Sequence, residues 1–382
     1  MLSISKMLSG QQESGDSLRY SGKRPPGPVV VWNATRACNL RCHHCYANAT
    51  AGADTGELTT EEARRFIDGL AAAGVPVLLF SGGEPLLRPD FFDLASYTRS
   101  RGIRPVVSTN GTLITREVAW RLKRTGVGYV GISLDGMREV NDRMRGIAGA
   151  FDAALEGIRN CLAVGQRVGL RFTITRDNYQ DIDAIFDLVE REGIARVCFY
   201  HLVCTGRGAS LRDKDLDPVE KRRVLDKIIV RTEDFCRRGL GKEVLTVDNH
   251  ADAAYIYLKL SRTRPGEAAR VYEWLRRSGG NRSGIAIGAV DWQGNVYPDQ
   301  FTRGHVLGNV REKDFAQIWQ NGAHPLLLAL RNRRPFLKGR CAACRWLDIC
   351  NGNFRARAEA VYGDFWAPDP GCYLTDEEIR PC

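Results

Sequence analysis

The sequence lacks any long hydrophobic run, and this absence narrows the classes of protein that it can encode. No stretch approaches the roughly 18 consecutive apolar residues of a membrane span, so we expect no transmembrane helix. The first 27 residues contain no apolar core of signal-peptide length, so we expect a cytoplasmic protein. With 43% hydrophobic and 26% charged residues and no low-complexity tract, the composition excludes a disordered chain and a collagen-like fibre.

A disulfide framework is absent too, because twelve cysteines are too few for one in a chain of 382 residues. In a reducing cytosol, clustered cysteines more often bind metal or carry out redox chemistry. The scattered cysteines fall within apolar stretches or a predicted helix, so we expect them to be small buried hydrophobes. These are Cys161, Cys198 and Cys236.

Three cysteines are packed near the N-terminus with the spacing CxxxCxxC, as Cys38, Cys42 and Cys45. Three thiolates this close, on a loop after a strand, can bind three irons of a [4Fe–4S] cube and leave the fourth iron free for a substrate. A structural zinc site needs four ligands. His43 or His44 could supply the fourth, so the triplet alone leaves zinc open.

Short apolar strands alternate with amphipathic helices after residue 28. Six such alternations predict a parallel sheet with right-handed crossovers, either a barrel or a partial barrel. The pattern predicts a charged helical bridge over residues 205–280. It also predicts a hairpin over residues 284–298, with its turn at Gln-Gly-Asn. The predicted strands are 29–32, 76–80, 104–109, 128–134, 168–175 and 195–202, and the helices between them are 58–74, 89–102, 115–126, 149–165 and 179–193.

Polar motifs follow consecutive strands, at the edge where a barrel binds its ligands. SGGEP comes directly after the second strand, where the unhindered N–H groups of Gly82 and Gly83, together with Glu84, can hold an amino group. STNG and SLDG follow the next two strands and can hydrogen-bond sugar hydroxyls, and the fifth strand carries an arginine that can pair with a carboxylate. Their side chains are Ser108, Asn110, Ser133, Asp135 and Arg171.

CNLRCHHC and SGGEP together resemble the radical S-adenosylmethionine (SAM) family, with His44 where an aromatic residue is usual. The resemblance covers residues 28–202 and implies an α/β fold built on a partial (βα)6 TIM barrel. It implies that Cys38, Cys42 and Cys45 ligate a [4Fe–4S] cluster whose open iron is chelated by SAM. One-electron cleavage of SAM would then give a 5′-deoxyadenosyl radical that abstracts hydrogen from the substrate. The implied SAM contacts are Gly82, Gly83, Glu84, Ser108, Asn110, Ser133 and Arg171.

CAACRWLDIC and Cys372 supply four more thiolates, enough for a second cluster or for zinc. This stretch resembles the cysteine-rich SPASM extension, but Asp299 stands where many relatives have a cysteine. We therefore expect one auxiliary [4Fe–4S] cluster, with Asp299 a less favoured ligand and Cys382 free. The expected ligands are Cys341, Cys344, Cys350 and Cys372. The predicted parts are an N-terminal arm (1–27), the radical SAM barrel (28–204), the helical bridge (205–280) and the SPASM-like domain (281–382).

Almost the whole chain, above all CNGNFRARAEAVYGDFWAPDPGCYLTDEEI, resembles the radical SAM proteins of alternative haem biosynthesis. That group acts on 12,18-didecarboxysiroheme and its products, and the arm favours the activity that removes two acetate side chains to give iron-coproporphyrin III. The alternatives are removal of propionates on the way to nitrite-reductase haem, and modification of a peptide. The implied partners are an iron-containing tetrapyrrole with several carboxylates and a flavodoxin- or ferredoxin-like reductant.

The net charge of +10 allows nucleic acid as a partner, but the basic residues are spread along helices with acids between them, so we expect none. A multiply carboxylated macrocycle needs arginines beside apolar walls. Our candidates for binding its carboxylates are Arg207, Arg355 and Arg357, and His201 is a candidate axial ligand to its iron. The aromatic candidates for the pocket wall are Tyr297, Tyr362 and Trp366.

Overall fold

The computed structural model describes residues 1–13, 15–21, 27–320 and 323–380, so Cys382 lies outside the described residues. Within them, eleven strands form one sheet in the order β1-β8-β7-β6-β5-β4-β3-β2-β9-β10-β11. The strands are β1 (Leu2–Ser3), β2 (Val29–Thr35), β3 (Val77–Gly82), β4 (Arg104–Thr109), β5 (Val130–Ser133), β6 (Val168–Ile174), β7 (Arg196–His201), β8 (Glu243–Val247), β9 (Ile287–Val290), β10 (Asn295–Tyr297) and β11 (Gly308–Asn309).

Strands β2 to β8 run parallel to one another, and the sheet curves without joining its two ends. The first six of them are the six predicted strands, so the predicted α/β fold with a partial barrel is confirmed. All their carboxyl ends meet at one edge, because parallel strands linked by outer helices must each return to the same side.

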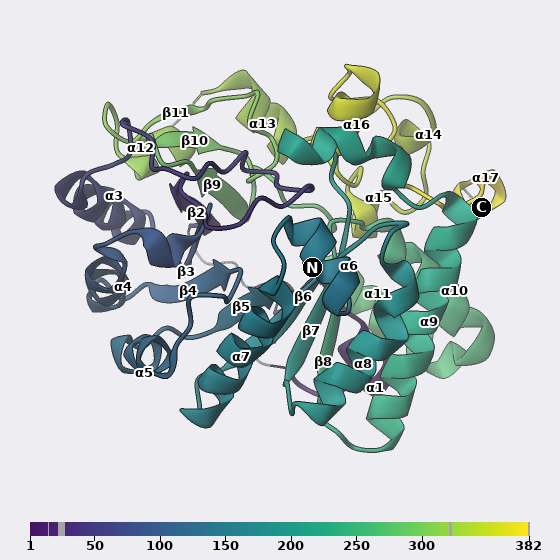
Figure 1. The fold of residues 1–382 in the computed structure, drawn as a ribbon. Coiled ribbons are helices and arrows are strands. Elements are labelled where there is room, and N and C mark those ends of the chain that lie inside the picture. Colours follow the sequence, from purple (N-terminus) through teal and green to yellow (C-terminus); the bar gives the residue numbers. More distant parts are fainter. Residues whose placement is uncertain (14, 22–26, 321–322, 381–382) are drawn as a thin grey trace.

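The helices that cross between these strands lie on the outer face of the sheet, as Figure 1 shows. Local sequence sets their ends: Thr59 and Glu62 form a capping box at the start of α3, and Gly126 ends α5 in the left-handed conformation. The outer helices are α3 (Thr60–Ala72), α4 (Phe91–Ser100), α5 (Arg116–Thr125), α7 (Ala150–Ala163) and α8 (Ile182–Arg191), whereas α6 (Arg138–Arg145) ends against the cysteine loop. Short 3₁₀ turns lie at η1 (Pro85–Leu87), η2 (Tyr179–Asp181) and η3 (Gly206–Lys214).

The remaining helices lie in the arm, the predicted bridge and the C-terminal part, and none in the described residues is long and apolar enough to cross a membrane. They are α1 (Ile4–Ser9), α2 (Asp16–Arg19), α9 (Pro218–Arg237), α10 (Ala251–Thr263), α11 (Pro265–Ser278), α12 (Phe315–Trp319), α13 (Pro325–Arg331), α14 (Gly339–Ala342), α15 (Leu347–Cys350), α16 (Arg355–Tyr362) and α17 (Asp376–Ile379). In the C-terminal part, α14 to α17 lie close together, whereas α12 lies beside α3 on the other side of the molecule (Figure 1).

The sheet crosses the predicted domain boundaries at both of its ends. β1, in the arm, pairs with β8 in the predicted bridge, and β9, in the C-terminal part, pairs in parallel with β2 of the barrel. The predicted hairpin is confirmed, because β9 and β10 are antiparallel. The four-part division itself stays a prediction, since one continuous sheet contains strands from all four parts.

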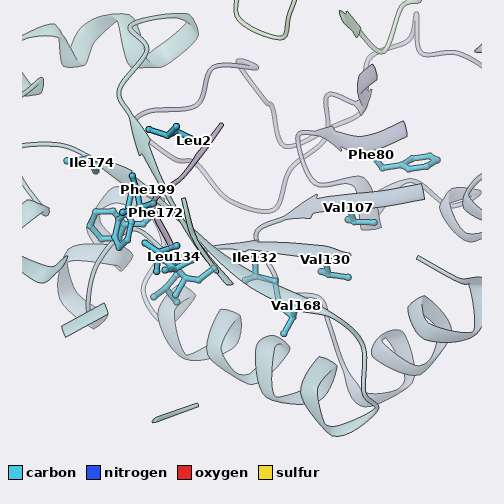
Figure 2. Close-up of a cluster of buried hydrophobic side chains, with 14 of the residues drawn as sticks. Leu2, Phe80, Val107, Val130, Ile132, Leu134, Val168, Phe172, Ile174 and Phe199 are labelled. Carbon is cyan, nitrogen blue, oxygen red and sulfur yellow. The ribbon is translucent and has the colours of Figure 1, made fainter. Parts of the chain in front are cut away.

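The main core lies between the sheet and its outer helices. Alternate residues of the strands point to this side and are buried, as Val130, Ile132, Phe172 and Phe199 illustrate (Figure 2). Phe199 contacts the rings of Phe172 and Phe186, with centroids 5.7 Å and 5.3 Å away. Burying these side chains removes apolar surface from water and provides most of the driving force for folding.

The opposite, inner face of the barrel is less completely buried. Ser108, Ser133, Arg171 and Tyr200, which alternate with the core residues of β4 to β7, are only half-buried. Water therefore reaches the inner face, whereas it does not reach the core on the other side. An inner face with polar side chains at the carboxyl edge is where a barrel holds small molecules.

Replacing the core ring of Phe199 tests this packing. Phe199→Ala should destabilise the fold by about 3–5 kcal/mol, because it leaves a cavity among buried rings. The matched control is Phe336→Ala, whose side chain is 44% exposed. Denaturant unfolding followed by circular dichroism measures both, and equal stability of the two variants would contradict this account of the core.

Candidate active site

The first cysteine triplet lies on a loop between β2 and α3 that has almost no secondary structure of its own. Cys38 and Cys45 pack around Leu40, Cys42 and Ala150, so the three side chains share one small cluster. The loop closes on itself, since the Cys38 N–H donates to the Thr50 carbonyl over 2.8 Å. All three are free thiols, as are all the other cysteines that the structure describes.

The surroundings of this triplet suit a bound metal cluster. Burial raises the pKa of Cys38 to about 12 and also raises the pKa of Cys42. Buried thiols therefore keep their protons until a cation replaces them, which is the ordinary chemistry of a cysteine metal site. In the described residues, no three His, Cys, Asp or Glu side chains converge closely enough for a single metal ion. A cube spreads its thiolates over separate irons and does not need such close convergence.

The SGGEP motif binds the start of this loop through its backbone. The N–H groups of Gly83 and Glu84 donate to the carbonyls of Thr35 and Ala37, over 2.8 Å and 2.7 Å. A Cβ on Gly83 would lie 2.0 Å from the Ala37 oxygen, so only glycine allows this approach. Of the two glycine N–H groups expected to face a ligand, that of Gly83 already has a backbone partner, and the role of SGGEP in binding an amino group stays a prediction.

Glu84 joins the ends of β3 and β4. Its carboxylate accepts hydrogen bonds from the Thr109 hydroxyl, the Asn110 N–H and the Leu86 N–H, over 2.8 Å, 2.8 Å and 3.1 Å. Complete burial nevertheless raises the pKa of Glu84 to about 7, because these donors only partly compensate for lost water. A cationic ligand beside this carboxylate would favour its charged form.

The other polar residues of the strand ends fall into two places. Ser108 and Arg171 meet on the inner face, where the guanidinium donates to the serine hydroxyl, and Ser133 lies beside Arg171 in the sheet. The Arg171 Nε is buried without a hydrogen-bond partner among the described residues. Asn110 lies instead against the cysteine loop, since its amide donates to the Asn39 side chain over 2.8 Å and approaches the Cys38 sulfur at 4.0 Å.

The second set of cysteines lies in the C-terminal part. Cys344, Cys350 and Cys372 pack against the edge of the main core, and burial raises the pKa of Cys350 and that of Cys372, the latter to about 11. Cys341 lies near enough to affect the ionisation of all three. Asp299 is occupied elsewhere, because its carboxylate accepts the N–H groups of Phe301 and Thr302 and so stabilises a turn.

The arginines proposed to bind substrate carboxylates are used inside the protein. Arg207 donates to the carbonyls of Cys42 and Ala49, over 2.9 Å and 2.6 Å, and so supports the cysteine loop. Arg355 and Arg357 are buried, the first donating to backbone carbonyls and the second paired with Asp369. The prediction for these three is therefore wrong, since their guanidinium groups already have partners.

His201 and the aromatic candidates are also occupied or misplaced. His201 is buried on the helix side of β7, where its Nε2 lies 3.0 Å from Asp252, so it does not face the inner side as an axial ligand would. Tyr297 is buried and donates to Asp291 over 2.8 Å. Trp366 stacks on Phe336, and Tyr362 is 58% exposed. The scattered Cys161 and Cys198 are buried, as predicted, whereas Cys236 is only half-buried because it lies near the exposed C-terminal end of α9.

Residues of the inner face that sequence reasoning missed include a trio at the ends of β2 and β3. The Tyr46 hydroxyl donates to Asn33 over 2.9 Å and lies 3.1 Å from the Ser81 hydroxyl. Tyr46 directly follows Cys45, so this trio connects the cysteine loop to the barrel interior. Polar Asn33 and Ser81 at alternate positions of otherwise apolar strands were the available signal.

Two family models match separate parts of the chain. Residues 32–189 match the model of the radical SAM superfamily, and residues 287–345 match SPASM, an iron-sulfur cluster-binding domain. Over 99% of both chains, the protein is 53% identical to Fe-coproporphyrin III synthase of Methanosarcina barkeri. It is 42% identical to pre-heme d1 synthase of Dinoroseobacter shibae, over 92% of this chain and 88% of that one.

Among solved structures, SuiB of Streptococcus suis bound to S-adenosylmethionine matches with a TM-score of 0.73 at 20% identity. The match covers 91% of this chain and 77% of SuiB. At this identity the likeness establishes the shared fold.

The raised pKa of Glu84 predicts a pH effect on stability. The folded state holds a proton on Glu84 up to about pH 7, whereas the ordinary pKa is 4.5, so this carboxyl makes the fold less stable as pH rises between those values. Glu84→Gln cannot ionise and should lose that slope. Unfolding measured from pH 5 to pH 7 tests this, with exposed Glu61→Gln as control, and an unchanged slope in Glu84→Gln would refute it.

The two sets of cysteines predict that iron can be removed from one cluster site without removing it from the other. Cys42→Ala and Cys350→Ala should each lower the iron content of anaerobically reconstituted protein by about half, because each removes a ligand of a different cluster. Cys236→Ala, in α9, should keep the full content. Iron and sulfide analysis measures this, and full iron content in both Cys42→Ala and Cys350→Ala would disprove the assignment.

Proposed function

The chain belongs to the radical SAM superfamily, and we propose that it removes the two acetate side chains of 12,18-didecarboxysiroheme to give iron-coproporphyrin III. The observation that carries this proposal is the high identity to Fe-coproporphyrin III synthase, which extends over the arm, the barrel and the C-terminal cysteines. The resemblance to haem-biosynthesis enzymes, based on the sequence motifs alone, leads to the same activity.

Removal of propionates from the same substrate is the second candidate. It is supported by the likeness to pre-heme d1 synthase, which is weaker and covers less of the chain. Modification of a peptide has less support still, because the solved structures with a bound peptide, SuiB and anSMEcpe, share only about a fifth of their residues with this chain.

We assign the first cluster to Cys38, Cys42 and Cys45, whose side chains share one small cluster on the loop after β2. A [4Fe–4S] cluster with SAM supplies one-electron cleavage of SAM to methionine and a 5′-deoxyadenosyl radical. Arg171, with its unpartnered Nε, is the natural partner for the SAM carboxylate. Glu84, between β3 and β4, favours a cationic amino group near it. The proposed contacts also include Gly82, Gly83, Ser108, Asn110 and Ser133.

An auxiliary [4Fe–4S] cluster is assigned to four thiolates of the SPASM extension. Asp299 is left out, because the turn that it stabilises engages both of its oxygens. Four protein ligands would close this cluster to substrate, which suits it to electron transfer. The proposed ligands are Cys341, Cys344, Cys350 and Cys372.

We place the tetrapyrrole over the inner face of the barrel. Leu79 and Val106 provide half-buried apolar surface there, and Tyr200 adds an aromatic ring whose hydroxyl has no partner in the described residues. The Arg41 side chain is exposed on the cysteine loop, and its guanidinium has no hydrogen bond or ion pair among the described residues, so it is free to bind a carboxylate. We further propose a cytoplasmic enzyme that receives electrons from a flavodoxin- or ferredoxin-like protein.

Turnover with the proposed substrate decides between the candidates. The anaerobically reconstituted protein is incubated with SAM, a reductant and 12,18-didecarboxysiroheme, and the product mass is measured. Loss of two acetates, with iron-coproporphyrin III left unchanged as a second substrate, is the expected result. The Cys42→Ala variant should give no product. Loss of propionates would favour the second candidate, and an unchanged tetrapyrrole would reject both.

A further inference from the structure

A buried arginine reaches the middle cysteine of the triplet. Arg145, the last residue of α6, is 7% exposed, and its Nη1 donates to the Cys42 sulfur over 3.6 Å. The other nitrogen of the fork, Nη2, forms an ion pair with Asp135. The guanidinium therefore connects the end of β5 to a candidate cluster ligand.

Asp135 is held in place from several sides. Its carboxylate is fully buried; Oδ1 accepts the Thr173 N–H over 2.6 Å, and Oδ2 lies 3.0 Å from the His44 Nε2 in an ion-pair contact. Its own backbone N–H donates to the Asn141 side chain over 2.9 Å, and Asn178 donates to its carbonyl over 3.1 Å. Asp135 thus fixes both Arg145 and the histidine that stands at the usual aromatic position.

The backbone of the loop is bound to the same helix end. The N–H groups of Arg41 and His43 donate to the carbonyls of Arg145 and Met144, over 3.1 Å and 3.0 Å. Gly146 follows in the left-handed conformation, where a Cβ would lie 2.8 Å from the Arg41 oxygen. Because the last carbonyls of a helix otherwise lack partners, this contact fixes the loop and the guanidinium together.

The guanidinium of Arg145 and the carboxylate of Asp135 change the reduction potential of a nearby cluster in opposite directions. A guanidinium that donates to a ligating sulfur stabilises negative charge there, and a reduced cluster carries one more negative charge than an oxidised one. Asp135 lies against the same guanidinium and offsets part of that effect. Burial strengthens both effects, because water does not screen them.

We propose that Arg145 is a positioning residue that raises the reduction potential of the cluster at Cys38, Cys42 and Cys45, and that Asp135 holds Arg145 in place and limits the rise. The inference rests on the proposed cluster ligands and not on the identity of the tetrapyrrole. It gives a role to α6, which sequence patterns did not reveal: the arginine at its end alters how readily the cluster accepts an electron.

The test is a redox titration of the reconstituted full chain followed by electron paramagnetic resonance, with SAM added to identify the signal of its cluster. Arg145→Met should lower the reduced-to-oxidised ratio at the wild-type midpoint by about tenfold, a shift of about 59 mV for a one-electron couple. Asp135→Asn should shift the midpoint in the opposite direction. Arg145→Lys, which keeps the charge, should recover part of the loss.

The controls separate this effect from misfolding. Arg143→Met, on the exposed side of α6, should leave the midpoint unchanged. Cys350→Ala, which removes a proposed ligand of the auxiliary cluster, should leave it unchanged too. Shifts in the same direction for Arg145→Met and Asp135→Asn, or no shift in either, would overturn the proposal. If Arg145→Met fails to retain its cluster, Asp135→Asn decides: a rise in its midpoint supports the proposal, and a fall or no change rejects it. If Cys38→Ala keeps the SAM-responsive signal, the proposed cluster ligands are wrong instead.

Discussion

The structure depends on how one irregular loop is bound to its surroundings. The segment between β2 and α3 carries three thiols and has no helix or strand of its own, so its shape depends on neighbouring elements as well as on its own hydrogen bonds. The end of β3 binds its start, the end of α6 binds its middle, and Arg207 binds its far side. A loop held at several points loses little further freedom on binding a cluster, because its ordering cost is met during folding.

The barrel explains why these supports meet at one place. Parallel strands bring Gly83, Glu84, Asn110 and Asp135 to the same edge, although they are far apart in the chain. The core on the helix side is mainly apolar and stabilises the sheet, while several side chains of the inner face are only half-buried. The same architecture therefore separates the part that provides stability from the part that can bind SAM and substrate.

Much of this arrangement could be predicted from the sequence, because the strands and helices of the barrel have clear apolar periods and the cysteine spacing is distinctive. The polar helix α6 has only a few apolar residues, and the short strands β1 and β8 lie beside charged helices, so periodicity did not reveal them. The roles of Arg207, Arg355 and Arg357 could not be predicted, since sequence does not show whether a guanidinium faces a ligand or a backbone carbonyl. His44 looked like a departure from the family pattern until Asp135 provided its partner.

The central claim is that the loop is already shaped to hold a cluster at Cys38, Cys42 and Cys45. The most direct measurement is an anaerobic crystal structure of the reconstituted protein with SAM. The account predicts a cube bound by these three sulfurs, SAM at its open iron, and the backbone hydrogen bonds to Thr35, Ala37, Met144 and Arg145 preserved. A single metal ion at these thiols, or a loop detached from the ends of β3 and α6, would contradict it.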